Sequence, residues 1–180
     1  MAKFIVIGER IHCISPTIRQ AMETMTPEPI LKRAKEQLDA GATYLDVNIG
    51  PAEKNGPELM QWAVKLLQEN FDNVPLCLDT SNRKAIEAGI QVYNRSKGKP
   101  IVNSADAGDR IENIDLAAAN DAICIALCSK AGVPSDNDSG CSTARRCWSG
   151  AWAWAWRRRT CGSTPCSWSS RACRTSRWKC

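Results

Sequence analysis

Residues 76–82 read LCLDTSN, a short apolar run that closes on Asp79 and leads directly into the start of a helix. A carboxylate at the end of a buried strand needs hydrogen-bond donors, because an unpaired buried charge is costly. Two other segments have the same design, residues 44–50 (YLDVNIG) before it and residues 101–104 (IVNS) after it. The three segments predict strands whose polar ends converge on one site, with Asp79 as its central residue.

Strand and helix patterns alternate along the chain on both sides of this stretch. Short β-rich or apolar runs predict strands at residues 4–7, 43–47, 74–78, 100–102 and 122–127. Helical spacing and start signals predict helices at residues 26–41, 55–67, 82–93 and 110–120, with Asn55 and Glu58 as a capping pair. Five such repeats with short connections predict a parallel α/β sheet with right-handed crossovers.

The strand ends favour a site but not a nucleotide site. Both (β/α)8 barrels and doubly wound sheets place their ligands at the C-terminal ends of their strands. The sequence has no G-x-G-x-x-G after the first strand and no P-loop, which argues against nucleotide binding.

The composition changes abruptly after Asp138. Residues 1–138 hold all 19 acidic residues and 15 of the 24 basic ones, a formal charge of −4, whereas residues 139–180 carry +9. That last stretch holds six of the ten cysteines and six of the seven tryptophans, but no Leu, Ile, Val, Met, Phe or Tyr. A segment without aliphatic residues has little with which to build a core. We therefore expect a partial barrel at residues 1–138 and a disordered basic Cys/Trp/Arg/Ser-rich tail at residues 139–180.

The tail suggests several functions, none of which we favour. Its cysteines form no C-x-x-C pair and it contains no histidine, so we expect no metal site. Interleaved arginines and tryptophans are compatible with nucleic-acid or membrane binding, and residues 151–156 alternate like a strand without an evident partner. We expect neither a nucleic acid nor a membrane as partner.

The genetic code offers another explanation for the tail. In residues 139–180, 41 of 42 residues have codons with G or C in the middle position. A GC-rich gene read out of frame produces this bias, and regrouping the bases around residues 159–169 allows an Asp-Pro-Leu-Leu sequence. Our hypothesis is a frameshift near residues 137–139 that replaced the second half of a barrel. An error-free, in-frame tail in the source gene would contradict it.

The N-terminus and the cysteines of residues 1–138 favour a cytoplasmic location. The apolar run at residues 4–7 is too short for a secretory signal, and no run approaches a membrane span. Two of the four cysteines, Cys77 and Cys124, lie inside apolar runs, as suits reduced thiols.

Four motifs in the predicted barrel carry a family resemblance. They read IGERI at residues 7–11, LDVNIGP at residues 45–51, LCLD at residues 76–79 and VNS at residues 102–104. Together they resemble the pterin-binding barrel of methyltetrahydrofolate:corrinoid-protein methyltransferases. That barrel is related to the folate domain of cobalamin-dependent methionine synthase and to dihydropteroate synthase. The resemblance covers residues 3–138 and implies the first five βα units of a (β/α)8 TIM barrel.

The resemblance implies the residues of a pterin site. By position, Asp79 and Asn103 match residues that hydrogen-bond the pterin ring, and Asp46 and Asn48 line the same mouth. A carboxylate accepts neighbouring N–H donors in charge-assisted bonds, and an amide supplies one donor group and one acceptor. The alternatives are that Asp79 is a solvated helix cap and that the two asparagines are turn residues.

Three further residues are candidates for the lip of the pocket. Glu9, Arg10 and His12 follow the first predicted strand. The first two could instead form a surface ion pair, and the chain's one histidine could be a solvated loop residue rather than a base. The family often has asparagine where this chain has His12, so the upper lip departs from the family pattern.

The resemblance also implies the reaction. The family moves a methyl group between N5 of methyltetrahydrofolate and a corrinoid carried by a partner protein. The folate is thus a substrate, and the full-length family usually forms homodimers. The site must help N5 acquire a proton or a hydrogen bond, but the sequence assigns no catalytic residue. We expect this chain alone to be inactive. The alternatives are a dihydropteroate-synthase-like pterin enzyme and a non-enzymatic truncated remnant.

Overall fold

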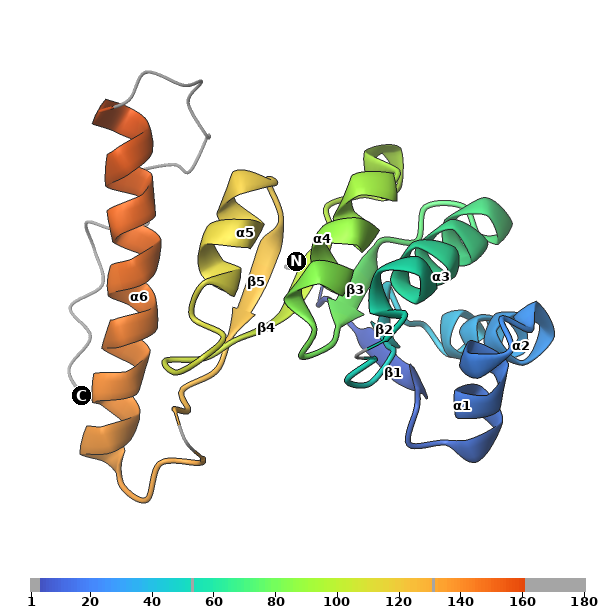
Figure 1. Cartoon of the computed structure of the whole chain (residues 1–180), viewed down its shortest axis with the longest axis horizontal. Helices are drawn as coiled ribbons and strands as arrows, with labels where there is room; N and C mark the ends of the chain where they lie inside the picture. Colours follow the sequence, from blue (N-terminus) through green and yellow to red (C-terminus); the bar gives the residue numbers. More distant parts are fainter. Residues whose placement is uncertain (1–3, 53, 131, 161–180) are drawn as a thin grey trace.

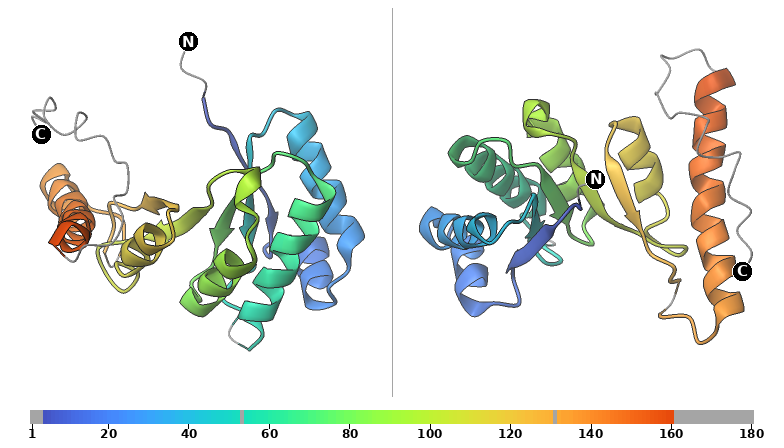
Figure 2. Two further views of the ribbon diagram at one scale, coloured as in Figure 1. Left: turned by 90° about the horizontal axis from the view of Figure 1, so that it is seen from above. Right: turned by 180° about the vertical axis from the view of Figure 1, so that it is seen from behind.

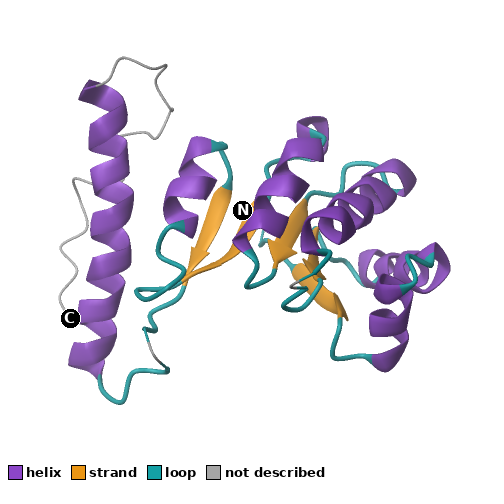
Figure 3. Ribbon diagram, in the orientation of Figure 1, coloured by secondary structure: helices purple, strands orange, loops and turns teal. Residues whose placement is uncertain are grey.

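The computed structural model describes residues 4–52, 54–130 and 132–160, with the backbone alone for residues 150–160. Predictions made for residues 161–180, including those for the last four cysteines, lie outside this range. Five strands form one parallel sheet in the order β1-β2-β3-β4-β5 (Figure 1 and Figure 3). Their bounds are β1 (Ile7–His12), β2 (Tyr44–Asn48), β3 (Leu76–Asp79), β4 (Ile101–Ala105) and β5 (Ile123–Ala126). The predicted parallel α/β sheet is confirmed.

Helices connect consecutive strands and lie on the outer side of the curved sheet (Figure 2). Their bounds are α1 (Pro16–Glu23), α2 (Pro27–Asp39), α3 (Gly56–Asn70), α4 (Arg83–Val92), a short 3-10 turn (Arg95–Lys97), α5 (Asn113–Ala119) and α6 (Asn137–Thr160). Asn82 caps α4 by accepting a hydrogen bond from the backbone N–H of Ala85, whereas the side chain of Asn55 makes no such bond at the start of α3. This succession of parallel βα units is the arrangement found in the first part of a TIM barrel.

Alternate strand residues divide the sheet into two faces. Leu45, Val47, Leu76, Leu78 and Val102 are fully buried in the core that the strands share with the helices. Side chains along a strand point alternately to opposite faces, so the residues between them point away from that core. Those residues include the polar ones expected at the site.

The first strand differs from its prediction, which ended it at Gly8. It continues to His12, with a change of register between Gly8 and Ile11. A side chain from α2 supports the irregular part, because Gln37 Oε1 accepts the backbone N–H of Arg10 at 2.7 Å. Gly8 leaves room for this bond, since a Cβ would lie 2.7 Å from the same oxygen and would displace the Gln37 side chain. The residues expected to form this strand, 4–6, precede it and are exposed.

The helix α1 has no counterpart among the elements predicted from the sequence. It begins at Pro16, and its Ile18 and Met22 are almost fully buried. The side chain of Arg19 ties it to the end of β1 by donating to the carbonyl of Cys13 at 2.8 Å. The connection between β1 and α2 therefore contains one helix more than predicted.

The described part of the expected tail is helical. The helix α6 runs across the expected domain boundary at residue 138 and stands beside α5 (Figure 1). Asp136 accepts the backbone N–H of Ser139 at 2.7 Å, which caps the first turn. Cys147 packs into a small cluster with Ala107 and Ile114. A cap and one packed thiol account for part of this helix, although it has no aliphatic stripe.

The sheet is open at both edges in the described part of the chain. β1 pairs only with β2, and β5 pairs only with β4. Large apolar side chains are exposed near these edges, namely Phe4, Ile5, Val6, Ile123 and Leu127. Within the described ranges, no helix has the length and apolar character that a transmembrane span requires.

Candidate pterin site

A row of polar residues crosses four strands at one level of the sheet. His12 is in register with Asn48, Asn48 with Asp79, and Asp79 with Asn103. Each of the first three is the last residue of its strand, whereas Asn103 lies in the middle of β4. Asp46 is two residues before Asn48 and therefore points to the same face, one layer deeper. Apolar runs with polar ends thus bring together side chains up to 91 residues apart.

These residues line a depression of about 320 Å³, near the lower limit for small-molecule sites. Its full lining is Glu9, His12, Ile14, Asp46, Asn48, Asp79 and Asn103. All but Ile14 were candidates from the sequence. The remaining candidate, Arg10, is exposed and does not line the depression.

Asp79 and Asn48 form a hydrogen-bonded pair. Asn48 Nδ2 donates to Asp79 Oδ2, and Asn48 Oδ1 accepts the backbone N–H of Gly50 at 2.9 Å. Both ends of this amide are therefore engaged by the protein. Among the described residues, the other carboxylate oxygen of Asp79 accepts no hydrogen bond from a side chain.

Asp46 and Asn103 form a second pair below the first. Asn103 Nδ2 donates to Asp46 Oδ1 at 3.1 Å, and the thiol of Cys77, in register on the adjacent strand, lies within reach of the same carboxylate as a donor. Asp46 is 4% exposed, so these donors compensate a charge that water hardly reaches. Cys77 was not singled out as a polar residue in the sequence. Its position two residues before Asp79 could have placed it on this face.

Burial dominates the electrostatics of the two carboxylates. Desolvation raises the pKa of Asp79 to about 6, and the neighbouring charge of Asp46 adds to this effect. The hydrogen bond from Asn48 and the positive charge of Arg110 oppose it. Desolvation also raises the pKa of Asp46, against the hydrogen bonds from Cys77 and Asn103. Two nearby carboxylates with raised pKa values are typical of a functional site.

His12 occupies the lip of the depression with an unsatisfied nitrogen. Its Nδ1 is buried and, among the described residues, has no hydrogen-bond partner. Buried polar atoms are normally paired with protein groups or ordered water. The ring ends β1 and is half-buried, which differs from the solvated loop residue considered as an alternative.

The loops behind the row are tied to each other. Thr80 Oγ1 donates to the carbonyl of Gly50 at 2.6 Å and accepts the backbone N–H of Asn82 at 3.0 Å. Asn82 Nδ2 donates to the carbonyl of Ala52 at 2.9 Å. These bonds join the loop after β2 to the loop after β3 and hold Asn48 and Asp79 side by side.

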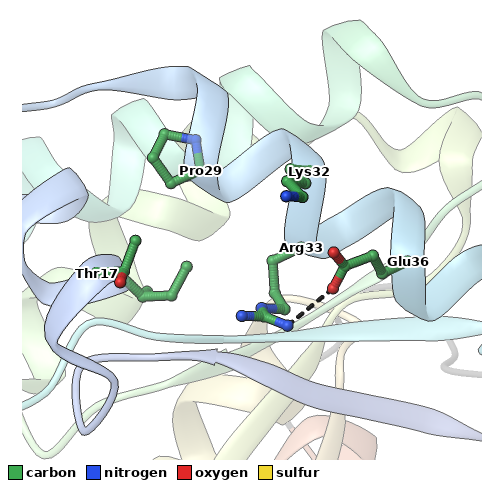
Figure 4. A pocket seen from close by; sticks show the side chains of 6 residues that line it. Thr17, Pro29, Lys32, Arg33 and Glu36 are labelled. Carbon is green, nitrogen blue, oxygen red and sulfur yellow. Dashed lines mark hydrogen bonds and ion pairs between the residues drawn. The ribbon is translucent and has the colours of Figure 1, made fainter.

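A second, smaller depression lies between α1 and α2 (Figure 4). Its volume is about 120 Å³, and it is lined by Thr17, Ile18, Pro29, Lys32, Arg33 and Glu36. Two cations, Lys32 and Arg33, line this depression. Arg33 is already paired, because its Nη1 donates to Glu36 Oε2 at 2.8 Å. It lies away from the strand ends and is too small for a folate. In the part of the chain that is described, no group of three His, Cys, Asp or Glu side chains is arranged to hold a metal ion.

Parallel strands in consecutive order, with helices on the outer side and polar residues at the strand ends, are typical of barrel-type α/β ligand-binding proteins. Within that class, the family of pterin binding enzymes matches residues 16–145. The chain therefore belongs to this family. A methylcorrinoid:tetrahydrofolate methyltransferase from Eubacterium limosum is 30% identical over 135 residues, which are 72% of this chain and 48% of the relative. The chain thus spans about half the length of that curated relative.

Proposed function

We propose that the row of polar residues binds the pterin ring of a reduced folate, tetrahydrofolate or its N5-methyl form. The observation that carries this proposal is the in-register series Asn48, Asp79 and Asn103, in which Asp79 keeps one carboxylate oxygen for a ligand. The edge of a pterin offers adjacent N–H groups, and a carboxylate is the acceptor that binds them most strongly. Family membership and the methyltransferase relative support the same ligand class.

The reaction proposed for the complete enzyme is methyl transfer between N5 of the folate and a corrinoid on a separate protein. When the methyl group leaves the folate, the C–N5 bond breaks, N5 keeps the electron pair and must then gain a proton. In the reverse direction, N5 attacks the methyl group, the bond between the methyl group and the corrinoid breaks with its electron pair left on the corrinoid, and N5 loses a proton. The residues of this chain would bind and orient the pterin, because positioning contributes a large part of such transfers. The cytoplasmic location and the corrinoid-protein partner belong to this proposal.

Calorimetry on the full chain tests the binding step. Tetrahydrofolate and methyltetrahydrofolate should bind with comparable affinity, and Asp79→Asn should weaken both. Asp39→Asn is the matched control, since Asp39 is exposed on α2 and paired with Lys35. Absence of binding to the unchanged chain would refute the proposal. Binding of a dihydropterin pyrophosphate but not of tetrahydrofolate would favour the dihydropteroate-synthase-like alternative.

We further propose that the chain alone does not turn over. In its described part, five strands leave a barrel of eight unclosed. An assay with purified methylcorrinoid protein and tetrahydrofolate should show no transfer above the uncatalysed rate. Measurable turnover would contradict this expectation. The frameshift hypothesis for residues 139–180 is tested separately by sequencing the source gene.

A further inference from the structure

We propose that Cys77 is a positioning residue of the site: its thiol, through Asp46, fixes which end of the Asn103 amide faces the ligand. The inference rests on the proposed pterin site and adds to it a residue that does not line the depression. The thiol, carboxylate and amide belong to the neighbouring strands β3, β2 and β4.

The geometry places the three side chains next to one another. Cys77 is in register with Asp46 on the adjacent strand, and its thiol lies within reach of the Asp46 carboxylate as a donor. Asn103 Nδ2 donates to the same carboxylate at 3.1 Å. Asp46 thus has the thiol beside it in its own layer and the amide of Asn103 in the layer above. Cys77 itself is completely buried, so no water replaces its contact.

The thiol is suited to a fixed donor role. Burial and the adjacent Asp46 raise the pKa of Cys77 far above its ordinary value, so the thiol stays protonated at any physiological pH. A proton that cannot leave gives the carboxylate a permanent donor. Asp46 then remains a charged acceptor, and a charged acceptor selects the N–H end of the Asn103 amide over its oxygen end.

The orientation of this amide matters to a ligand. With Nδ2 held by Asp46, Asn103 presents its oxygen and one remaining N–H in fixed positions. Without the thiol donor, Asp46 would be easier to protonate, and a protonated carboxyl can donate to the amide oxygen. Rotation of the amide would then exchange donor and acceptor at the wall of the pocket. A ligand matched to the first arrangement would bind poorly to the second.

Two substitutions separate this role from simple packing. Cys77→Ser keeps a donor, whereas Cys77→Val fills the space without one. A buried cysteine that only packs behaves as a small hydrophobic residue, so valine should replace it better than serine. The positioning role requires the opposite order. We expect tetrahydrofolate affinity within about threefold of the unchanged chain for serine and roughly tenfold weaker for valine, the equivalent of one lost hydrogen bond.

A second measurement does not depend on folate binding. The side-chain amide signals of Asn103, assigned by their loss in Asn103→Ala, are followed by 15N–1H NMR on the free full chain between pH 5 and 8. The unchanged chain and Cys77→Ser should give the same signals, and Cys77→Val should shift them with a new pH dependence. Identical signals in all three proteins, or valine binding as well as the unchanged chain, would overturn the positioning role. If no protein binds tetrahydrofolate, the proposed function fails, while the NMR comparison still decides the role of Cys77.

Discussion

Replacing Asp79 by asparagine should change stability and ligand affinity in opposite directions. The folded protein raises the pKa of Asp79 from 3.8 to about 6, mainly because the carboxylate is partly desolvated. A shift of about two pKa units corresponds to at most about 3 kcal/mol, and solvent near the half-buried side chain reduces this to roughly 1–2 kcal/mol. Asparagine has the same shape, carries no charge and can still accept the hydrogen bond from Asn48.

The sign follows from proton binding. Between pH 3.8 and 6 the folded state holds the Asp79 proton more tightly than the unfolded state, so raising the pH through this window lowers the free energy of unfolding. The ionised Asp79 side chain therefore destabilises the folded state fully above about pH 6 and not at all below about pH 3.8. Urea denaturation at pH 7.5 should therefore find Asp79→Asn more stable than the unchanged chain, with the difference disappearing near pH 4. Asp39→Asn, on the exposed face of α2, should show no such gain.

The affinity for tetrahydrofolate, in contrast to the stability, should fall in Asp79→Asn. One oxygen of Asp79 is engaged by Asn48, so one charge-assisted bond to the ligand is at stake. Its loss is equivalent to about 1.5–3 kcal/mol, or roughly 10- to 150-fold in the dissociation constant of tetrahydrofolate. Calorimetry at pH 7.5 measures this directly. A variant that is less stable than the unchanged chain, or that binds tetrahydrofolate equally well, would refute the reasoning.

Three substitutions test the framework around the site. Tyr93→Phe removes the acceptor of the buried Leu76 N–H, a bond of 2.9 Å, and should cost about 1–3 kcal/mol in urea denaturation; an unchanged midpoint would contradict this. Gly89→Ala places a Cβ 2.6 Å from Met60 Cγ, so the melting temperature should fall by the equivalent of about 1–3 kcal/mol, and a rise would mean that α3 and α4 repack freely. Asp136→Ala removes the cap of α6 and should lower the helical circular dichroism signal by destabilising that helix by about 1 kcal/mol, whereas an unaltered spectrum would mean that the cap is dispensable.

The sheet and most helices could be predicted because their signals are local. Mainly apolar runs of three to six residues, each followed by a turn or helix start, mark strands β2 to β5 without reference to the rest of the chain. The convergence of Asp46, Asn48, Asp79 and Asn103 on one depression also follows, since parallel strands bring their C-terminal ends to the same edge. Which atoms a ligand contacts remains a proposal.

Other features depend on partners far away in the sequence and could not be predicted. The continuation of β1 past Gly8 relies on Gln37, which lies 27 residues from the backbone N–H it accepts. The position of Cys77 beside Asp46 depends on the register of two strands, which alternation alone does not determine. Residues 137–160 have no helical apolar stripe, so the cap from Asp136 was the one local sign of α6. The division of the chain at residue 138 stays a prediction.

The shape of the sheet has a consequence for how long a ligand would stay. In the described part of the chain, the row of side chains lines the depression, and both sheet edges are open. A flat heterocycle bound there would be held by hydrogen bonds along its edge, and one of its two faces would remain exposed to solvent. Such a complex would exchange quickly, so saturation-transfer NMR, which favours short-lived complexes, suits this chain better than methods that require slow release.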